Sequence, residues 1–331
     1  MTTSISKVKS MEKRKPSWRF LKYFLIALAV FVAVTGAFLY FNLYFLFPGS
    51  GPAGPGVPAE PFKQTWSQRN VLLLGIGDSV TDGFGASSGF SYFDRLIQNP
   101  PGDSEDMLGK NLSVVFPKMK TENLAVSGSN SIYHLKVVRR LETHPDTLGI
   151  VVMTTGGNDL IHNYGRSLPK EGAMYGATLE QARPWISNFE KRLDQMINGV
   201  KVKFPGGCHV FLANIYDPSD STGRTAKWIT GLPKWPDGLA ILKAYNKIIT
   251  KAAQEHENVH LVDIHDAFLG HGIHFKKFWL KHCRLRNAHF WYAMIIEDPN
   301  NRGYDAIRRL FLIEMAKVFF DSASLRLSSN D

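Results

Sequence analysis

Cysteine is scarce in this sequence, with only Cys208 and Cys283 among 331 residues. Two thiols exclude a disulfide-rich scaffold and a zinc site built from several cysteines. We expect two buried or free thiols, with a bridge between them as the alternative. The composition also lacks strong bias, at 44% hydrophobic and 21% charged residues. A collagen-like, low-complexity or globally disordered chain is therefore excluded.

Acidic residues are in the minority, with 29 Asp and Glu against 39 Lys and Arg, which gives a net charge of +10. The excess is concentrated at the N-terminus, because residues 1–22 hold seven basic residues and only Glu12 as an acid. The rest of the chain is close to neutral. A basic surface for nucleic acid is therefore not expected, and nucleic acid is excluded as a partner.

Charge is absent from residues 23–47, which follow the basic stretch directly. We predict a transmembrane helix over residues 21–47, since a helix of that length spans roughly 40 Å against a hydrocarbon core of about 30 Å. A cleaved signal peptide is the alternative, but its apolar region is normally shorter and ends in small residues. Basic residues ahead of the span predict a cytoplasmic segment 1–20, an extracytoplasmic remainder and the lipid bilayer as a partner.

Glycine and proline dominate the stretch that follows, where they fill nine of the fourteen positions 48–61. This composition disfavours helix and strand, so residues 48–69 are predicted to be a linker. A domain over residues 70–325 is expected to follow it.

Strand and helix patterns alternate along this domain. Short apolar runs predict buried strands at 71–76, 112–116, 149–154, 210–215 and 260–264. Helical spacing of apolar residues predicts helices at 91–98, 131–141, 179–202, 239–256 and 304–320. Such alternation favours a parallel sheet with helices on both faces, and in these sheets ligands bind at the carboxyl ends of the strands.

Three candidate residues follow predicted strands. Ser79 comes directly after the first strand, within Gly-Asp-Ser, and is placed to act as a nucleophile. Gly128 offers an unobstructed main-chain N–H, and Asn158, within Gly-Gly-Asn-Asp, offers a side-chain amide. Acyl transfer needs such donors aimed at the developing oxyanion. Each residue also has a purely structural interpretation as a turn or helix-cap residue.

Taken together, these blocks resemble the SGNH hydrolases, also called the GDSL esterase/lipase family, over residues 70 to about 320. The resemblance implies a flavodoxin-like three-layer α/β/α sandwich, hydrolysis of carboxylic esters, and no metal or cofactor. It implies Ser79 as the nucleophile, and the Ser79 N–H, the Gly128 N–H and the Asn158 side chain as the oxyanion hole.

The last family block departs from this pattern, which has Asp-x-x-His before Pro-Asn. Alignment on Pro299 puts Asp298 at the histidine position and Ile295 at the aspartate position. We predict that His289 serves as the base instead, with Asp298 or Glu297 orienting it. His271 and His274 are alternatives, and a helix cap is the structural interpretation of Asp298.

The sequence thus predicts a membrane-anchored serine esterase that acts on acyl or acetyl esters outside the cytoplasm, such as those of envelope lipids or glycans. A binding or scaffolding protein with a decayed active site is one alternative, because the family histidine is missing. An O-acyltransferase of envelope glycans is another, because it would use the same nucleophile and oxyanion hole.

Overall fold

A computed structural model describes residues 18–41, 49, 51–223, 232–284, 289–293 and 297–328. The chain divides into two compact units, Met1–Phe47 and Pro48–Asp331. The basic residues 1–17 and the end of the predicted span, residues 42–47, lie outside the described residues.

Helix α1 (Trp18–Phe41) is the described part of the first unit. It has a stretch of mean hydropathy 2.2, none of which is buried against the rest of the protein. Within the described ranges it is the one helix long and apolar enough to cross a membrane. A helix of this kind near an N-terminus is typical of membrane anchors and also of signal sequences.

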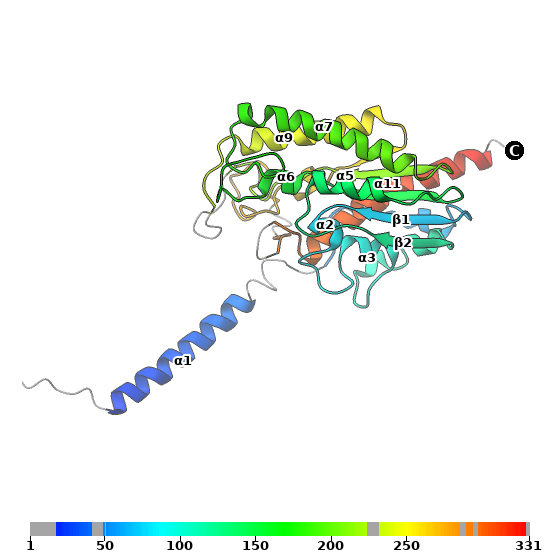
Figure 1. Ribbon diagram of the computed structural model, residues 1–331. Coiled ribbons are helices and arrows are strands. Elements are labelled where there is room, and N and C mark those ends of the chain that lie inside the picture. Colours follow the sequence, from blue (N-terminus) through cyan, green and yellow to red (C-terminus); the bar gives the residue numbers. More distant parts are fainter. Residues whose placement is uncertain are drawn as a thin grey trace, which may run out of the picture. The chain divides into compact units, whose positions relative to one another are not determined.

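The second unit is built on a five-stranded parallel sheet with the strand order β2-β1-β3-β4-β5 (Figure 1). The strands are β1 (Val71–Ile76), β2 (Met119–Asn123), β3 (Leu148–Thr154), β4 (Cys208–Ala213) and β5 (Val259–Val262). This order is that of flavodoxin-like proteins, in which ligands bind where the strand order reverses, here beside β1 and β3. The predicted fold class is confirmed.

Helices cover both faces of the sheet (Figure 1). One face is covered by α5 (Ser131–Arg140), α7 (Leu179–Lys201) and α9 (Gly238–Glu255). The other is covered by α3 (Tyr92–Ile97), α4 (Leu112–Val115) and α11 (Asn301–Ser328). The shorter helices are α2 (Ser79–Asp82), α6 (Gly157–Ile161), α10 (Ile264–Phe268), η2 (Glu60–Lys63) and η3 (Glu105–Met107).

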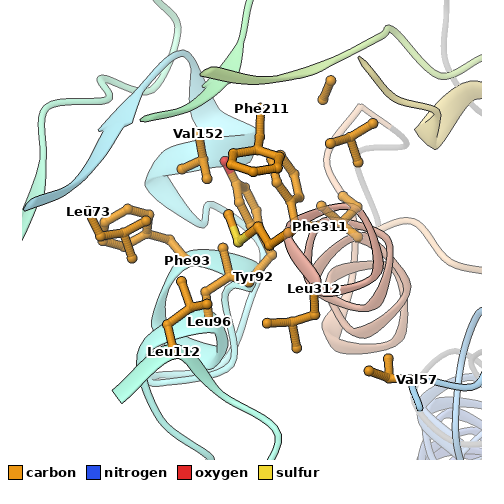
Figure 2. Packing of buried hydrophobic residues seen from close by; sticks show 14 of the residues in the cluster. Val57, Leu73, Tyr92, Phe93, Leu96, Leu112, Val152, Phe211, Phe311 and Leu312 are labelled. Carbon is orange, nitrogen blue, oxygen red and sulfur yellow. The ribbon is translucent and has the colours of Figure 1, made fainter. Parts of the chain in front are cut away.

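The core is split by the sheet because successive side chains of a strand point to opposite faces. In β1, Leu73 packs toward α3 and α11, whereas Leu74 packs toward α5, α7 and α9. Figure 2 shows the first of these two cores, where Tyr92 of α3 stacks on Phe311 of α11 at 4.9 Å between ring centroids. This packing holds α3 and α11 together against the same face of the sheet.

The predicted strand at 112–116 is wrong, because that segment is α4 and the strand lies later, at β2. Leu112, Val115 and Phe116 are buried at the i, i+3, i+4 spacing of a helix. β2 is an edge strand of largely exposed, polar residues, so no apolar run marks it. The predicted free thiols are confirmed, since Cys208 and Cys283 are both unbridged.

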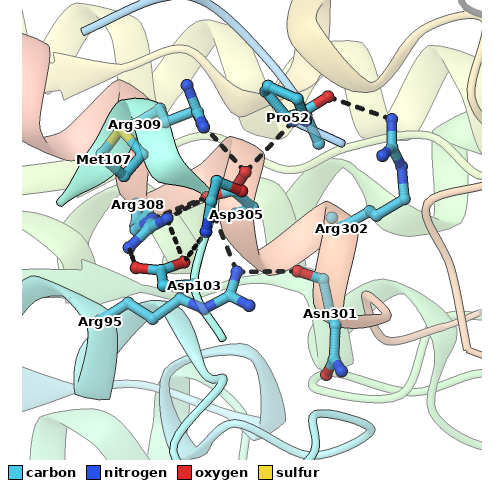
Figure 3. Close-up of polar contacts among 12 residues, drawn as sticks. Pro52, Arg95, Asp103, Met107, Asn301, Arg302, Asp305, Arg308 and Arg309 are labelled. Carbon is cyan, nitrogen blue, oxygen red and sulfur yellow. Dashed lines mark hydrogen bonds and ion pairs between the residues drawn. The ribbon is translucent and has the colours of Figure 1, made fainter. Parts of the chain in front are cut away.

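Residues 51–69, which we call the N-terminal strap, do not behave as the predicted linker. Ala53, Val57, Phe62 and Trp66 of the strap are buried in the core on the α11 side. The Ala53 N–H donates to Asp305 Oδ2 at 3.2 Å, and Arg302 donates to the carbonyl of Pro52 at 3.2 Å (Figure 3). Apart from the single turn of η2, the strap has no regular structure, and its carbonyls accept hydrogen bonds from Arg302 and Arg309. The strap therefore packs as part of the domain.

A buried ion network lies beneath the strap, at the start of α11 (Figure 3). Asp305 is only 3% exposed. Its carboxylate accepts from Arg308 Nε at 2.7 Å and from Arg309 Nε at 3.0 Å. Both arginines also form ion pairs with the loop between α3 and α4, which contains η3. Arg308 pairs with Asp103, and Arg309 pairs with Asp106. The network therefore ties the strap, this loop and α11 together.

Candidate active site

The turn after β1 presents Ser79 at the carboxyl edge of the sheet. Asp78 caps α2, with its Oδ1 accepting from Val80 N–H at 3.2 Å and from Thr154 Oγ1 at 2.9 Å. Gly77 is required because a Cβ there would collide with Thr154 Oγ1. The cap thus fixes the nucleophile turn to the end of β3, and Ser79 itself stays half-buried.

The Ser79 side chain lies beside the carboxyl of Asp298, close enough for hydrogen bonding from Ser79 to lower the pKa of that carboxyl. Asp298 lies just ahead of α11 and is 4% exposed. Its carbonyl accepts from the Ala293 N–H at 2.7 Å, and Pro299 beside it bridges to Tyr292. A serine hydroxyl and a carboxylate therefore meet from segments more than 200 residues apart.

Two carboxyl groups of this site hold their protons more tightly than usual. Burial raises the pKa of Asp78 to about 6, helped by repulsion from Asp298 and opposed by the bonds from Thr154 and Val80. Burial likewise raises the pKa of Asp298 to about 6, with repulsion from Glu297 adding to it and the Ser79 bond opposing it. Both groups therefore exchange protons close to neutral pH, which is where general bases operate.

The predicted oxyanion donors lie on either side of Ser79. Gly128 has a left-handed φ of 78°, and open space surrounds the position where a Cβ would stand. Its loop is tied to the nucleophile turn by the bond from Val126 N–H to the Gly77 carbonyl at 3.0 Å. Asn158 lines the same cavity as Ser79, and its Nδ2 donates to the carbonyl of Ser129 at 2.8 Å. An amide nitrogen carries two N–H groups, so Asn158 has a second donor besides the one bonded to Ser129.

A buried histidine that the sequence analysis did not single out supports this loop. His134 of α5 bridges Ser129 Oγ and Thr155 Oγ1, each at 2.8 Å. Burial lowers the pKa of His134 to about 3, so the imidazole is neutral. The sequence carried a signal for it, since position 134 lies on the apolar face of the predicted helix, four residues before Val138.

A cavity of about 190 Å³ opens beside Ser79. Its lining is mostly apolar and includes Leu160, Ile161, Tyr175, Trp235, Leu239 and Leu242. Tyr164 borders the cavity in a left-handed conformation with φ 49°, and its hydroxyl donates to Glu297 Oε2 at 2.8 Å. A non-glycine residue held in this region costs free energy and is common at functional sites.

The structure does not bring His289 to Ser79 as predicted. The ring of His289 lies against Gly49 instead. The His289 carbonyl accepts from His271 Nδ1 at 2.9 Å, and His271 stacks on Trp291 at 3.4 Å between ring centroids. Burial lowers the pKa of His271 to about 3.

His274, the remaining alternative, is buried, and its N–H donates to Asp220 Oδ2 at 2.8 Å. None of the three histidines lines the cavity beside Ser79. Ile295, at the family's aspartate position, lies outside the described residues.

The nucleophile turn, the carboxyl partner and the amide donor, at the edge of a flavodoxin-like sheet, are typical of α/β hydrolases that act on ester bonds. Residues 76–306 match the family model described as GDSL-like lipase/acylhydrolase, and the chain belongs to that family. It is an ester-bond hydrolase.

Three proteins similar to this chain are distant from it in sequence. The chain is 20% identical over 207 residues to the uncharacterized protein YpmR of Bacillus subtilis (strain 168), covering 62% of this chain and 71% of YpmR. A catalytic mutant of Axe2, an acetylxylan esterase from Geobacillus stearothermophilus, is 18% identical with a TM-score of 0.45, over 76% of this chain and 96% of that one. Phospholipase A1 from Streptomyces albidoflavus is 20% identical with a TM-score of 0.43, over 75% of this chain and 99% of the phospholipase chain.

Proposed function

We propose that this protein is a membrane-anchored serine esterase that hydrolyses carboxylic esters with an apolar acyl chain. The observation that carries the proposal is the position of Ser79. Its side chain lies beside the buried carboxyl of Asp298, and it stands at the edge of a mostly apolar cavity.

Hydrolysis would proceed in two steps through an acyl-enzyme. Ser79 Oγ attacks the ester carbonyl, and the oxyanion is held by the N–H of Ser79, the N–H of Gly128 and the second amide N–H of Asn158. Collapse of this intermediate expels the alcohol and leaves the acyl group on Ser79. Water then attacks the acyl-enzyme at the same carbonyl and releases the acid.

The cavity supports an acyl chain over an acetyl group as the preferred substrate. Its volume of about 190 Å³ is more than ten times the ~10–15 Å³ of cavity volume needed to hold one water. An acetyl group would leave most of this apolar space unfilled. Each methylene that enters it instead contributes about 0.8 kcal/mol to binding.

Helix α1 supports the membrane location, because 24 residues make a helix of about 36 Å, enough to cross a hydrocarbon core of about 30 Å. The basic residues ahead of it favour a cytoplasmic N-terminus and an extracytoplasmic hydrolase domain. Esters with acyl chains are abundant at a membrane surface, which agrees with the apolar cavity.

The proposal is tested with the full chain purified in detergent and a series of p-nitrophenyl esters from acetyl to decanoyl. The wild type should hydrolyse the medium chains fastest, and Ser79→Ala should lower kcat by at least about 10³-fold. Ser113→Ala, an exposed serine whose hydroxyl donates to the Ile97 carbonyl, is the matched control and should keep full activity. Equal rates for the wild type and Ser79→Ala across the series would refute the proposal and favour a binding or scaffolding role.

A further inference from the structure

We propose that Asp298 is the general base of this site and accepts the proton of Ser79 directly. This inference rests on the proposed function, since it concerns the base of the same reaction.

The first support is the contact itself. Ser79 lies beside the Asp298 carboxyl, and hydrogen bonding from its side chain lowers the pKa of that carboxyl. The start of α11 also reaches the nucleophile turn, because the Tyr304 hydroxyl donates to the Ser79 carbonyl at 3.4 Å. A base must be within hydrogen-bond reach of the group that it deprotonates. Asp298 meets this condition already in the free enzyme, with no movement of a loop.

The second support is the way in which the chain holds Asp298 in place. The bridge between Tyr292 and Pro299 closes the segment on which Asp298 stands. On the other side, a Cβ at Gly85 would stand 3.6 Å from the Asp298 Cβ, so the loop after α2 packs against it. Tyr304 fastens that loop, because its hydroxyl donates to the Phe84 carbonyl at 2.7 Å. The carboxylate is therefore positioned by packing from both sides.

The third support is the electrostatic setting of the carboxylate. Its ionisable neighbours are acidic or phenolic, namely Asp78, Glu297, Tyr164, Tyr216 and Tyr304. Burial among these groups raises the pKa of Asp298 to about 6, near that of an ordinary imidazole. A carboxylate with an ordinary pKa would be too weak a base for this reaction near neutral pH.

The proton balance of the reaction closes with Asp298 alone. As Ser79 Oγ bonds to the carbonyl carbon, its proton passes to Asp298, and the neutral acid then protonates the departing alkoxide. The carboxylate formed in that step takes a proton from water, whose oxygen attacks the acyl-enzyme. Asp298 returns this proton to Ser79 as the acid leaves, and the enzyme is restored.

The test compares Asp298→Asn with Asp194→Asn in kcat and KM on the best ester of the series. Asp194 lies on α7 with 56% of its side chain exposed, so its variant controls for the same chemical change at the surface. Asp298→Asn should lower kcat by about 10²- to 10⁴-fold with little change in KM, the range typical of general-base catalysis. Asp194→Asn and His289→Ala should both retain wild-type kcat.

The pH profile of the wild type provides a second measurement that does not depend on how a variant folds. The kcat/KM should rise with pH and reach half its plateau near pH 6, where Asp298 loses its proton. This midpoint should stay nearly constant with temperature, because carboxyl ionisation has little enthalpy, whereas an imidazole midpoint falls on warming.

The outcomes separate this inference from the proposed function. Activity that needs Ser79 but survives in Asp298→Asn, or that is lost in His289→Ala, would overturn the inference and leave the esterase intact. A midpoint that falls markedly on warming would also overturn it. Activity that is insensitive to Ser79→Ala would instead refute the proposed function.

Discussion

The substitution Asp305→Asn tests how the N-terminal strap is held on the domain. Asp305 is buried and accepts hydrogen bonds from the Ala53 N–H, Arg308 and Arg309. It also lies 3.7 Å from Arg95. Burial lowers the pKa of the Arg95 guanidinium to about 10, and repulsion from the positive charge of Arg308 contributes to this lowering. This region therefore holds several positive charges close together.

Removal of this carboxylate charge leaves three buried guanidinium groups with less compensation. Loss of one partner from a buried ion pair costs about 3–5 kcal/mol. Because Arg308 keeps Asp103 and Arg309 keeps Asp106, we expect the lower end, about 3 kcal/mol. For a domain of this size, 1 kcal/mol shifts Tm by roughly 2–4 °C, so Tm should fall by about 6–12 °C.

The assay is thermal unfolding of the full chain in detergent, with hydrogen exchange of the Ala53 amide as a local measurement. Asp106→Asn is the matched control, since Asp106 belongs to the same network but has 40% of its side chain exposed. Its loss should cost no more than about 1 kcal/mol. A Tm within 2 °C of the wild type for Asp305→Asn, or a larger drop for Asp106→Asn, would refute the reasoning.

Two further predictions concern the cavity and the buried carboxyls. Ile161→Trp should fill part of the cavity and displace about three methylenes of a bound acyl chain. The kcat/KM for octanoyl esters should therefore fall roughly 50-fold, while the kcat/KM for butyryl esters changes little. Equal losses of kcat/KM for both esters would contradict this. Asp78 has a raised pKa, so the folded state holds a proton that the unfolded state loses first, and wild-type stability falls as pH rises from about 4 to 6. Asp78→Asn cannot lose this proton, so its free energy of unfolding, relative to the wild type, should rise by on the order of 2–3 kcal/mol between pH 4 and pH 7. The same difference between variant and wild type at both pH values would contradict the assignment.

Local patterns in the sequence were enough to predict much of the fold. The run Val71–Ile76 is apolar at every position because β1 is buried on both faces, and its bounds were predicted without error. The helix at α7 was predicted from the helical period of its apolar residues. Strand β2 was missed because an edge strand with exposed polar residues leaves no such pattern.

The sequence by itself determined the class of this protein, because the blocks around Ser79, Gly128 and Asn158 together resemble those of the GDSL esterase/lipase family. It also placed Asp298 in the family's histidine position. Only the tertiary structure decided that the Asp298 carboxylate contacts Ser79 while His289 lies against Gly49. Such pairings join segments far apart in the chain and depend on how α11 and the strap pack, which no local pattern encodes.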